Sequence, residues 1–141
     1  MRIQSFSYRD GMPSDEKGHG GGYIFDCRCL PNPGKHEAYA QLSGKNAPVI
    51  AFLETQRPVQ RFLEQVYGLI SQSVENYRTR NFTDLLVAFG CTGGRHRSVY
   101  CAERLARHIK EKYKVAVEIK HRALETKEAS ISDKVNESAP S

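Results

Sequence analysis

The stretch of this chain richest in chemically active groups is FGCTGGRHRS, residues 89–98. Its two adjacent glycines let backbone amides approach an anion without hindrance from side chains. The residues around them add hydroxyl, imidazole and guanidinium donors, and an arginine can pair with two phosphate oxygens. The predicted phosphate-binding residues are Thr92, Gly93, Gly94, His96, Arg97 and Ser98. A glycine-bearing turn with solvated arginines is the alternative interpretation, but so many coinciding donors favour a bound phosphate.

The same stretch allows a second chemistry, because Cys91, Gly94 and Arg97 form the pattern C-x-x-G-x-x-R. This pattern resembles the signature loop of cysteine-dependent protein tyrosine phosphatases. There, a helix start and the arginine lower the pKa of the thiol, which then acts as the nucleophile. Cys91 and Arg97 would be the catalytic residues under this hypothesis. Those phosphatases usually have a histidine before the cysteine, whereas Gly90 stands here. The loop alone leaves both chemistries open, and the wider sequence favours binding without catalysis.

Apolar patterns on both sides of this stretch predict the elements that position it. DLLVAF, residues 84–89, is a continuous apolar run, typical of a strand buried on both faces. Residues 99–109 and 59–74 have helical spacing. Further strands are expected at residues 3–8, 23–29 and 115–119. This order predicts an α/β fold, a small sheet with helices packed on it, whose ligands bind at the carboxyl ends of the strands.

The composition is that of one soluble domain. The chain has 141 residues, 39% of them hydrophobic, and no apolar run near the roughly 18 residues that a membrane span needs. Its start lacks the hydrophobic segment of a secretory signal, so we expect a cytoplasmic protein with reduced cysteines. Cys27 and Cys29 are expected on one face of a strand in a buried structural role, because their spacing differs from that of a zinc pair. We expect neither a metal nor a cofactor.

Charge separates a basic body from a polar tail. The net charge is +5, and residues 122–141 hold three basic and four acidic side chains, which leaves about +6 on residues 1–121. A basic body favours acidic partners such as phosphates or nucleic acid. Beyond Leu124 large apolar residues are nearly absent. We therefore expect one domain over residues 1–124 and a disordered tail over residues 125–141.

Longer motifs indicate a family. GCTGGRHRSVYCAERLA, residues 90–106, is similar to the signature of the C-terminal domain of the RapZ RNase adapter proteins. FDCRCLPNP, LSGKNAPVIAFLE and HRALE agree with the same family and follow in the same order. The resemblance covers roughly residues 3–125. The sequence has no G-x-x-x-x-G-K-[ST] motif, so we expect a stand-alone domain without the family's P-loop nucleotide-binding domain and its hydrolysis of ATP or GTP.

The resemblance implies a fold like the sugar-phosphate half of phosphofructokinases. It also implies binding of glucosamine-6-phosphate and of small regulatory RNA, a link to an RNase, and self-association into a homo-oligomer. Thr92, Gly93, His96 and Arg97 would hold the phosphate, and Asp26 and Arg28 would line the same pocket. A carboxylate at position 26 could pair with the ammonium group of an amino sugar. A cap at the end of a strand is the alternative role for Asp26.

The chain departs from the family pattern in two places. The family histidine after PNP is replaced by Gly34, and His36 follows two places later as a candidate for the same pocket. The family's basic cluster after HRALE is reduced to Lys127. The predicted RNA-binding residues are Lys112, Lys114, Lys120, Arg122 and Lys127. With this depleted cluster we expect weak RNA binding by the lone domain, strengthened by avidity in an oligomer.

Overall fold

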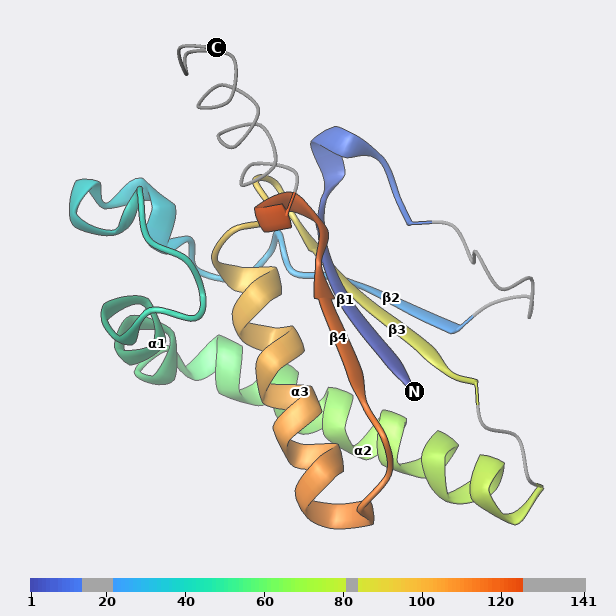
Figure 1. Ribbon diagram of the computed structural model, residues 1–141. Helices are drawn as coiled ribbons and strands as arrows, with labels where there is room; N and C mark the ends of the chain where they lie inside the picture. Colours follow the sequence, from blue (N-terminus) through green and yellow to red (C-terminus); the bar gives the residue numbers. More distant parts are fainter. Residues whose placement is uncertain (14–21, 81–83, 126–141) are drawn as a thin grey trace, which may run out of the picture.

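A computed structural model of the chain describes residues 1–13, 22–80 and 84–125. The predicted disordered tail lies outside the described residues except for Glu125, and so does Lys127. The described elements form an α/β fold, as predicted, with helices packed on a four-stranded parallel sheet (Figure 1).

The sheet has the order β2-β3-β1-β4, and every neighbouring pair of strands is parallel. The two central strands are β1 (Arg2–Ser7) and β3 (Leu86–Cys91), and all residues of both are buried. The two edge strands are β2 (Gly22–Asp26) and β4 (Glu118–His121), whose residues alternate between more and less exposed positions. Because all four strands are parallel, their carboxyl ends meet at one edge of the sheet.

Three helices complete the core: α1 (Ala47–Glu54), α2 (Arg57–Thr79) and α3 (Arg97–Tyr113). Helix α3 packs on β1, β3 and β4, and α2 packs on α3 (Figure 1). The side chains that fill the space between sheet and helices include Ile3, Val87 and Phe89 from the strands and Ile70 and Leu105 from the helices. The helical spacing noted for residues 59–74 and 99–109 is the buried stripe of α2 and α3.

The sequence-based predictions missed several elements or their limits. Helix α1 and three short 3-10 turns, at Tyr8–Asp10, Pro33–Lys35 and Glu37–Tyr39, were not predicted. Strand β4 begins at Glu118 instead of residue 115, because Lys114 adopts a left-handed conformation with φ of 52° that ends α3, and residues 114–117 connect the two elements.

Strand β2 ends at Asp26, so the prediction that Cys27 and Cys29 share a strand face is wrong. The Asp26 carboxylate accepts a hydrogen bond from the backbone amide of Arg28, at 2.9 Å, and this turn directs the chain away from the sheet. Cys27 is completely buried, as predicted, but Cys29 is exposed. All four cysteines are free thiols. No helix among the described residues is long and apolar enough to cross a membrane.

Candidate functional site

Residues 92–96, here called the glycine loop, connect β3 to α3 at the carboxyl edge of the sheet. The Ser7 hydroxyl at the end of β1 donates to the Thr92 carbonyl at 2.6 Å. Gly94 has a φ of +66°, and a Cβ there would lie 2.7 Å from the Cβ of Ala123 and 2.8 Å from the amide nitrogen of Ser7. Only glycine fits this position, because both the conformation and the space exclude a side chain. The loop is therefore held tightly against β1.

The backbone amides of the glycine loop have no acceptor in the part of the chain that the structure describes. None of the five amides from Thr92 to His96 donates a hydrogen bond to a described residue. Thr92 and Gly93 are exposed, and a Cβ at Gly93 would meet nothing within 4 Å. The loop leads into α3, whose N-terminus adds a partial positive charge. Such an arrangement suits an anion that accepts hydrogen bonds from several amides.

Two basic side chains of the loop donate to the protein's own backbone. Arg95 donates from Nε to the Leu42 carbonyl at 2.8 Å and from Nη2 to the Gln41 carbonyl. His96 Nε2 donates to the Tyr39 carbonyl at 2.9 Å. Burial lowers the pKa of His96, which favours the neutral ring with its single proton on Nε2. These two side chains hold the segment 39–42 against the loop.

Arg97 at the first position of α3 is only 5% exposed. Its Nη1 donates to the carbonyls of Arg28, at 2.8 Å, and Leu30, at 3.0 Å. Its Nε is buried without a hydrogen-bond partner, and no described carboxylate forms an ion pair with the guanidinium. A buried charge without a counterion is costly. Arg97 therefore holds a buried positive charge that forms no ion pair with a described residue, and together with the hydrogen bond from Arg28 this charge helps to lower the pKa of Asp26.

Asp26 and Arg28 lie at the carboxyl end of β2 and form an ion pair with each other. Arg28 Nη2 lies 2.7 Å from Asp26 Oδ2, and both side chains are about half exposed. The Arg28 guanidinium stacks over the ring of Tyr8 at 3.9 Å from the ring centroid. Hydrogen bonding from Arg28 lowers the pKa of Asp26, and the same bond raises the pKa of Arg28. The pair presents a fixed guanidinium to solvent and keeps Asp26 ionised.

Ser98, predicted to bind phosphate, and Cys91, the predicted catalytic thiol of the phosphatase hypothesis, are both buried. Ser98 is completely buried, and its hydroxyl lies 3.2 Å from the sulfur of Cys91, which is 2% exposed. The neighbouring thiol of Cys101, together with burial, holds the pKa of Cys27 well above its usual range. A thiol enclosed like that of Cys91 has no open approach for an in-line attack on a phosphate ester.

His36 is exposed, and its ring packs on Tyr39 and Phe52, with centroid separations of 5.8 and 5.3 Å. Gly34, which stands in place of the family histidine, lies beside the ring of His96: a Cβ on Gly34 would be 3.2 Å from Cε1 of that ring. The ring contacts of His36 are thus with the 3-10 turn and α1, and none of them is with the glycine loop.

The predicted RNA-binding residues do not form one cluster. Lys112 and Lys114 are exposed at the end of α3, on the side of the amino ends of the strands. Lys120 and Arg122 lie at the carboxyl end of β4, where Lys120 is 4.0 Å from Glu125 and Arg122 donates to Gln4 at 3.5 Å. The two basic pairs therefore occupy opposite edges of the sheet.

Sequence reasoning missed two residues that shape this site, Tyr8 and Arg95. Tyr8 directly follows β1, so the rule that sites lie at carboxyl strand ends could have indicated it. Arg95 lies inside the motif itself. Its partners, however, are 53 and 54 positions earlier in the chain, and no local pattern connects them.

The fold is a parallel α/β sheet with a glycine loop between a buried strand and a helix. It places this protein among the α/β proteins whose candidate ligand sites lie at the carboxyl ends of the strands. A family model described as the RapZ C-terminal domain matches residues 1–125, and the chain belongs to this family. The family resemblance drawn from the motifs is thereby confirmed.

Among curated relatives, a nucleotide-binding protein of Methylobacillus flagellatus is 45% identical over 127 residues, which are 89% of this chain and 43% of the relative. A nucleotide-binding protein of Saccharophagus degradans is 40% identical over 127 residues, which are 90% of this chain and 42% of the relative. The RNase adapter protein RapZ of Yersinia pseudotuberculosis is 39% identical over 125 residues, which are 89% of this chain and 42% of the relative. The chain thus spans about two fifths of the length of these relatives.

Proposed function

We propose that this domain binds a phosphorylated metabolite, such as glucosamine-6-phosphate, at the glycine loop and does not transform it. The observation that carries this proposal is a combination of two features: loop amides without an acceptor among the described residues, and the buried guanidinium of Arg97, which forms no ion pair with any of them. A phosphate bound at the loop would accept hydrogen bonds from these amides and neutralise the charge of Arg97. Arg28, whose guanidinium stacks on the ring of Tyr8, is an exposed cation at the same edge of the sheet.

Asp26 is the residue proposed to recognise the amino group of the ligand. This carboxylate stays ionised and lies at the same sheet edge as the glycine loop. It is paired with Arg28, so an ammonium group would share the carboxylate with the guanidinium or displace it. We therefore expect only a small preference for glucosamine-6-phosphate over glucose-6-phosphate, on the order of threefold.

Titration calorimetry with glucosamine-6-phosphate, glucose-6-phosphate and inorganic phosphate tests the proposal. Arg28→Ala should weaken binding of all three ligands about tenfold, since a charge-assisted hydrogen bond is lost. Arg61→Ala removes an exposed arginine from α2 and serves as the matched control. No heat of binding at about 10 mM ligand would contradict the proposal.

The same protein should release no product from para-nitrophenyl phosphate. Cys91 is the thiol that a phosphatase mechanism requires, and it is enclosed beside Ser98. Turnover that disappears in Cys91→Ser while phosphate still binds would favour the phosphatase hypothesis over simple binding.

We further propose that the domain contributes to an RNase adapter function, with small RNA and an RNase as partners and with self-association. This proposal rests on the family and on the name of the Yersinia relative, together with the basic body of the chain. With basic residues divided between two edges of the sheet, one copy should bind RNA weakly. Several copies in an oligomer would bind it more tightly through avidity.

A further inference from the structure

A pocket lies between α1, the turn at Gly44 and the middle of α3. Its volume is about 330 Å³. The polar side chains that line it are Lys45, Glu54, Tyr100, Glu103, Arg104 and Arg107. None of them belongs to the glycine loop or to the pair of Asp26 and Arg28. Gly44 separates the two places: its amide donates to the Arg95 carbonyl, and a Cβ there would lie 2.5 Å from the amide nitrogen of Tyr100.

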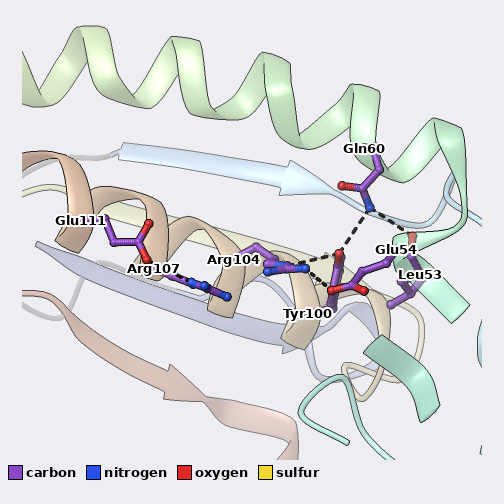
Figure 2. A network of polar contacts seen from close by, with 7 residues as sticks. All are labelled: Leu53, Glu54, Gln60, Tyr100, Arg104, Arg107 and Glu111. Atoms are coloured by element: carbon purple, nitrogen blue, oxygen red, sulfur yellow. Dashed lines mark hydrogen bonds and ion pairs between the residues drawn. The ribbon is translucent and has the colours of Figure 1, made fainter. Parts of the chain in front are cut away.

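The hydroxyl of Tyr100 is a committed donor in this pocket. Tyr100 is 1% exposed, and its oxygen accepts hydrogen bonds from Gln60 Nε2 and from Arg104 Nε, both at 3.3 Å (Figure 2). The nitrogen of the Gln60 side-chain amide, and not its oxygen, faces Tyr100, because the same atom also donates to the Leu53 carbonyl at 3.2 Å. A phenolic oxygen that already accepts two hydrogen bonds can form one more, in which it donates its own proton. No described residue accepts that proton.

The cations around the pocket have donors to spare. Arg104 uses Nε for Tyr100 and Nη2 for Glu54, and its Nη1 has no partner among the described residues (Figure 2). Arg107 uses only Nε, which donates to Glu111 at 3.1 Å on the exposed surface of the helix. The ammonium group of Lys45 is exposed and forms no ion pair with a described residue.

The two acidic groups at the pocket already have partners. Glu54 pairs with Arg104, and Glu103 accepts a hydrogen bond from His121 Nε2 at 2.8 Å. Once these acceptors are satisfied, the groups with donors unused among the described residues are the Tyr100 hydroxyl, the Nη1 edge of Arg104, the ammonium of Lys45 and the rest of the Arg107 guanidinium, whose Nε is already bound to Glu111. All of them are donors, so their natural partner is an acceptor that carries more than one negative charge.

We propose that this pocket binds a small dianion, a phosphate monoester or a dicarboxylate, independently of the glycine loop. The dianion takes the hydroxyl proton of Tyr100 and the free Nη1 edge of Arg104, and Lys45 and Arg107 close over it. This second site is distinct from the proposed metabolite site, since neither site uses a ligand-binding side chain of the other.

The test is a two-dimensional NMR titration of the ¹⁵N-labelled full chain, with inorganic phosphate in one series and succinate in the other. Amides of residues 44–45 and 103–107 report on the pocket, and amides of residues 92–96 report on the glycine loop. Saturable shifts of the pocket amides with either probe support the proposal, and the probe that saturates them identifies the anion class. Pocket amides that do not shift with either probe at about 10 mM overturn it.

Variants show whether the assigned donors hold the anion. The double variant Lys45→Ala/Arg107→Ala removes two exposed cations and should weaken binding at the pocket by about tenfold. The matched control Arg57→Ala/Arg61→Ala removes two exposed arginines of α2 and should leave it unchanged. Tyr100→Phe keeps the ring but removes the proton, and thermal unfolding checks that this variant still folds. Parental affinity at the pocket in the double variant or in folded Tyr100→Phe overturns the proposal.

Discussion

At the scale of single residues, the last two side chains of the glycine loop and the first side chain of α3, all of them basic, act as scaffolding. Arg95, His96 and Arg97 all donate to backbone carbonyls of segments that approach the loop from elsewhere in the chain. Among the groups left for a ligand are the backbone amides and the exposed Arg28. This division of roles means that a basic residue in the motif can be essential for the site without touching the ligand.

Replacing Arg97 therefore tests stability as well as binding. Arg97→Ala leaves the carbonyls of Arg28 and Leu30 without their donor, and the free energy of unfolding should fall by about 2–3 kcal/mol. Phosphate affinity should fall too, because the buried charge is gone. Urea unfolding and titration calorimetry measure the two effects. If affinity falls and stability does not, Arg97 is a direct ligand and the scaffolding role is wrong.

His96 should make stability depend on pH. Burial lowers its pKa in the folded protein below the ordinary value of 6.5, so on acidification the unfolded chain binds a proton before the folded one does. The free energy of unfolding is therefore expected to decrease as the pH falls from 6.5 through the folded pKa, and to be unaffected by His96 above that range.

His96→Gln provides the matched comparison, because a glutamine can still donate to the Tyr39 carbonyl but does not titrate. The loss of stability between about pH 7.5 and pH 5.5, measured by urea unfolding, should be smaller in this variant. His108, whose pKa is also lowered by burial, contributes equally to both proteins. Equal losses in the two proteins would show that His96 is not the titrating group.

At the scale of elements, the glycine loop depends on close contact between the start of α3, the end of β1 and the segment after β4. Gly94 lies at this junction, with a positive φ and with Ser7 and Ala123 in contact. Gly93, its neighbour in sequence, faces open space. The same substitution at the two glycines therefore adds the same methyl group in different surroundings, so one variant is a control for the other.

Gly94→Ala should destabilise the fold by about 1–3 kcal/mol, because the added methyl group clashes with backbone and the left-handed conformation is strained. Gly93→Ala should change the free energy of unfolding by less than about 0.5 kcal/mol. Chemical unfolding of both variants measures the difference. Similar losses at both positions would mean that the loop is not held against β1 as described.

At the scale of the whole molecule, the charge distribution predicts weak RNA binding that depends on salt. The body carries about +6, and each phosphate contact by lysine or arginine releases counterions. In a gel-shift series with a stem-loop RNA, affinity should fall steeply between low and physiological salt. Lys120→Glu should weaken binding more than Lys112→Glu, since Lys120 lies beside the HRALE segment at the carboxyl edge. Tight binding that ignores salt would contradict an electrostatic origin.

The sequence alone was enough to determine the class of fold, the family and the place of the candidate site. Hydrophobic periodicity identified the buried strand β3 and the helices α2 and α3, because the apolar residues of a buried face recur at the regular spacing of the element. A glycine-rich segment between such a strand and helix must lie at the carboxyl edge of a parallel sheet. The position of the glycine-rich segment in the fold could thus be predicted before any coordinate was known.

Only the tertiary structure decided what each residue of the candidate site contacts. Arg97 and Ser98 have the donors that a phosphate needs, yet one bonds to carbonyls at positions 28 and 30 and the other faces Cys91. Tyr100 is an ordinary buried position in the helical pattern, yet its hydroxyl gathers donors from α2 and α3. The physical reason is that hydrogen bonds join groups according to distance in space. Residues tens of positions apart compete for the same donors, and no local sequence pattern records which of them prevails.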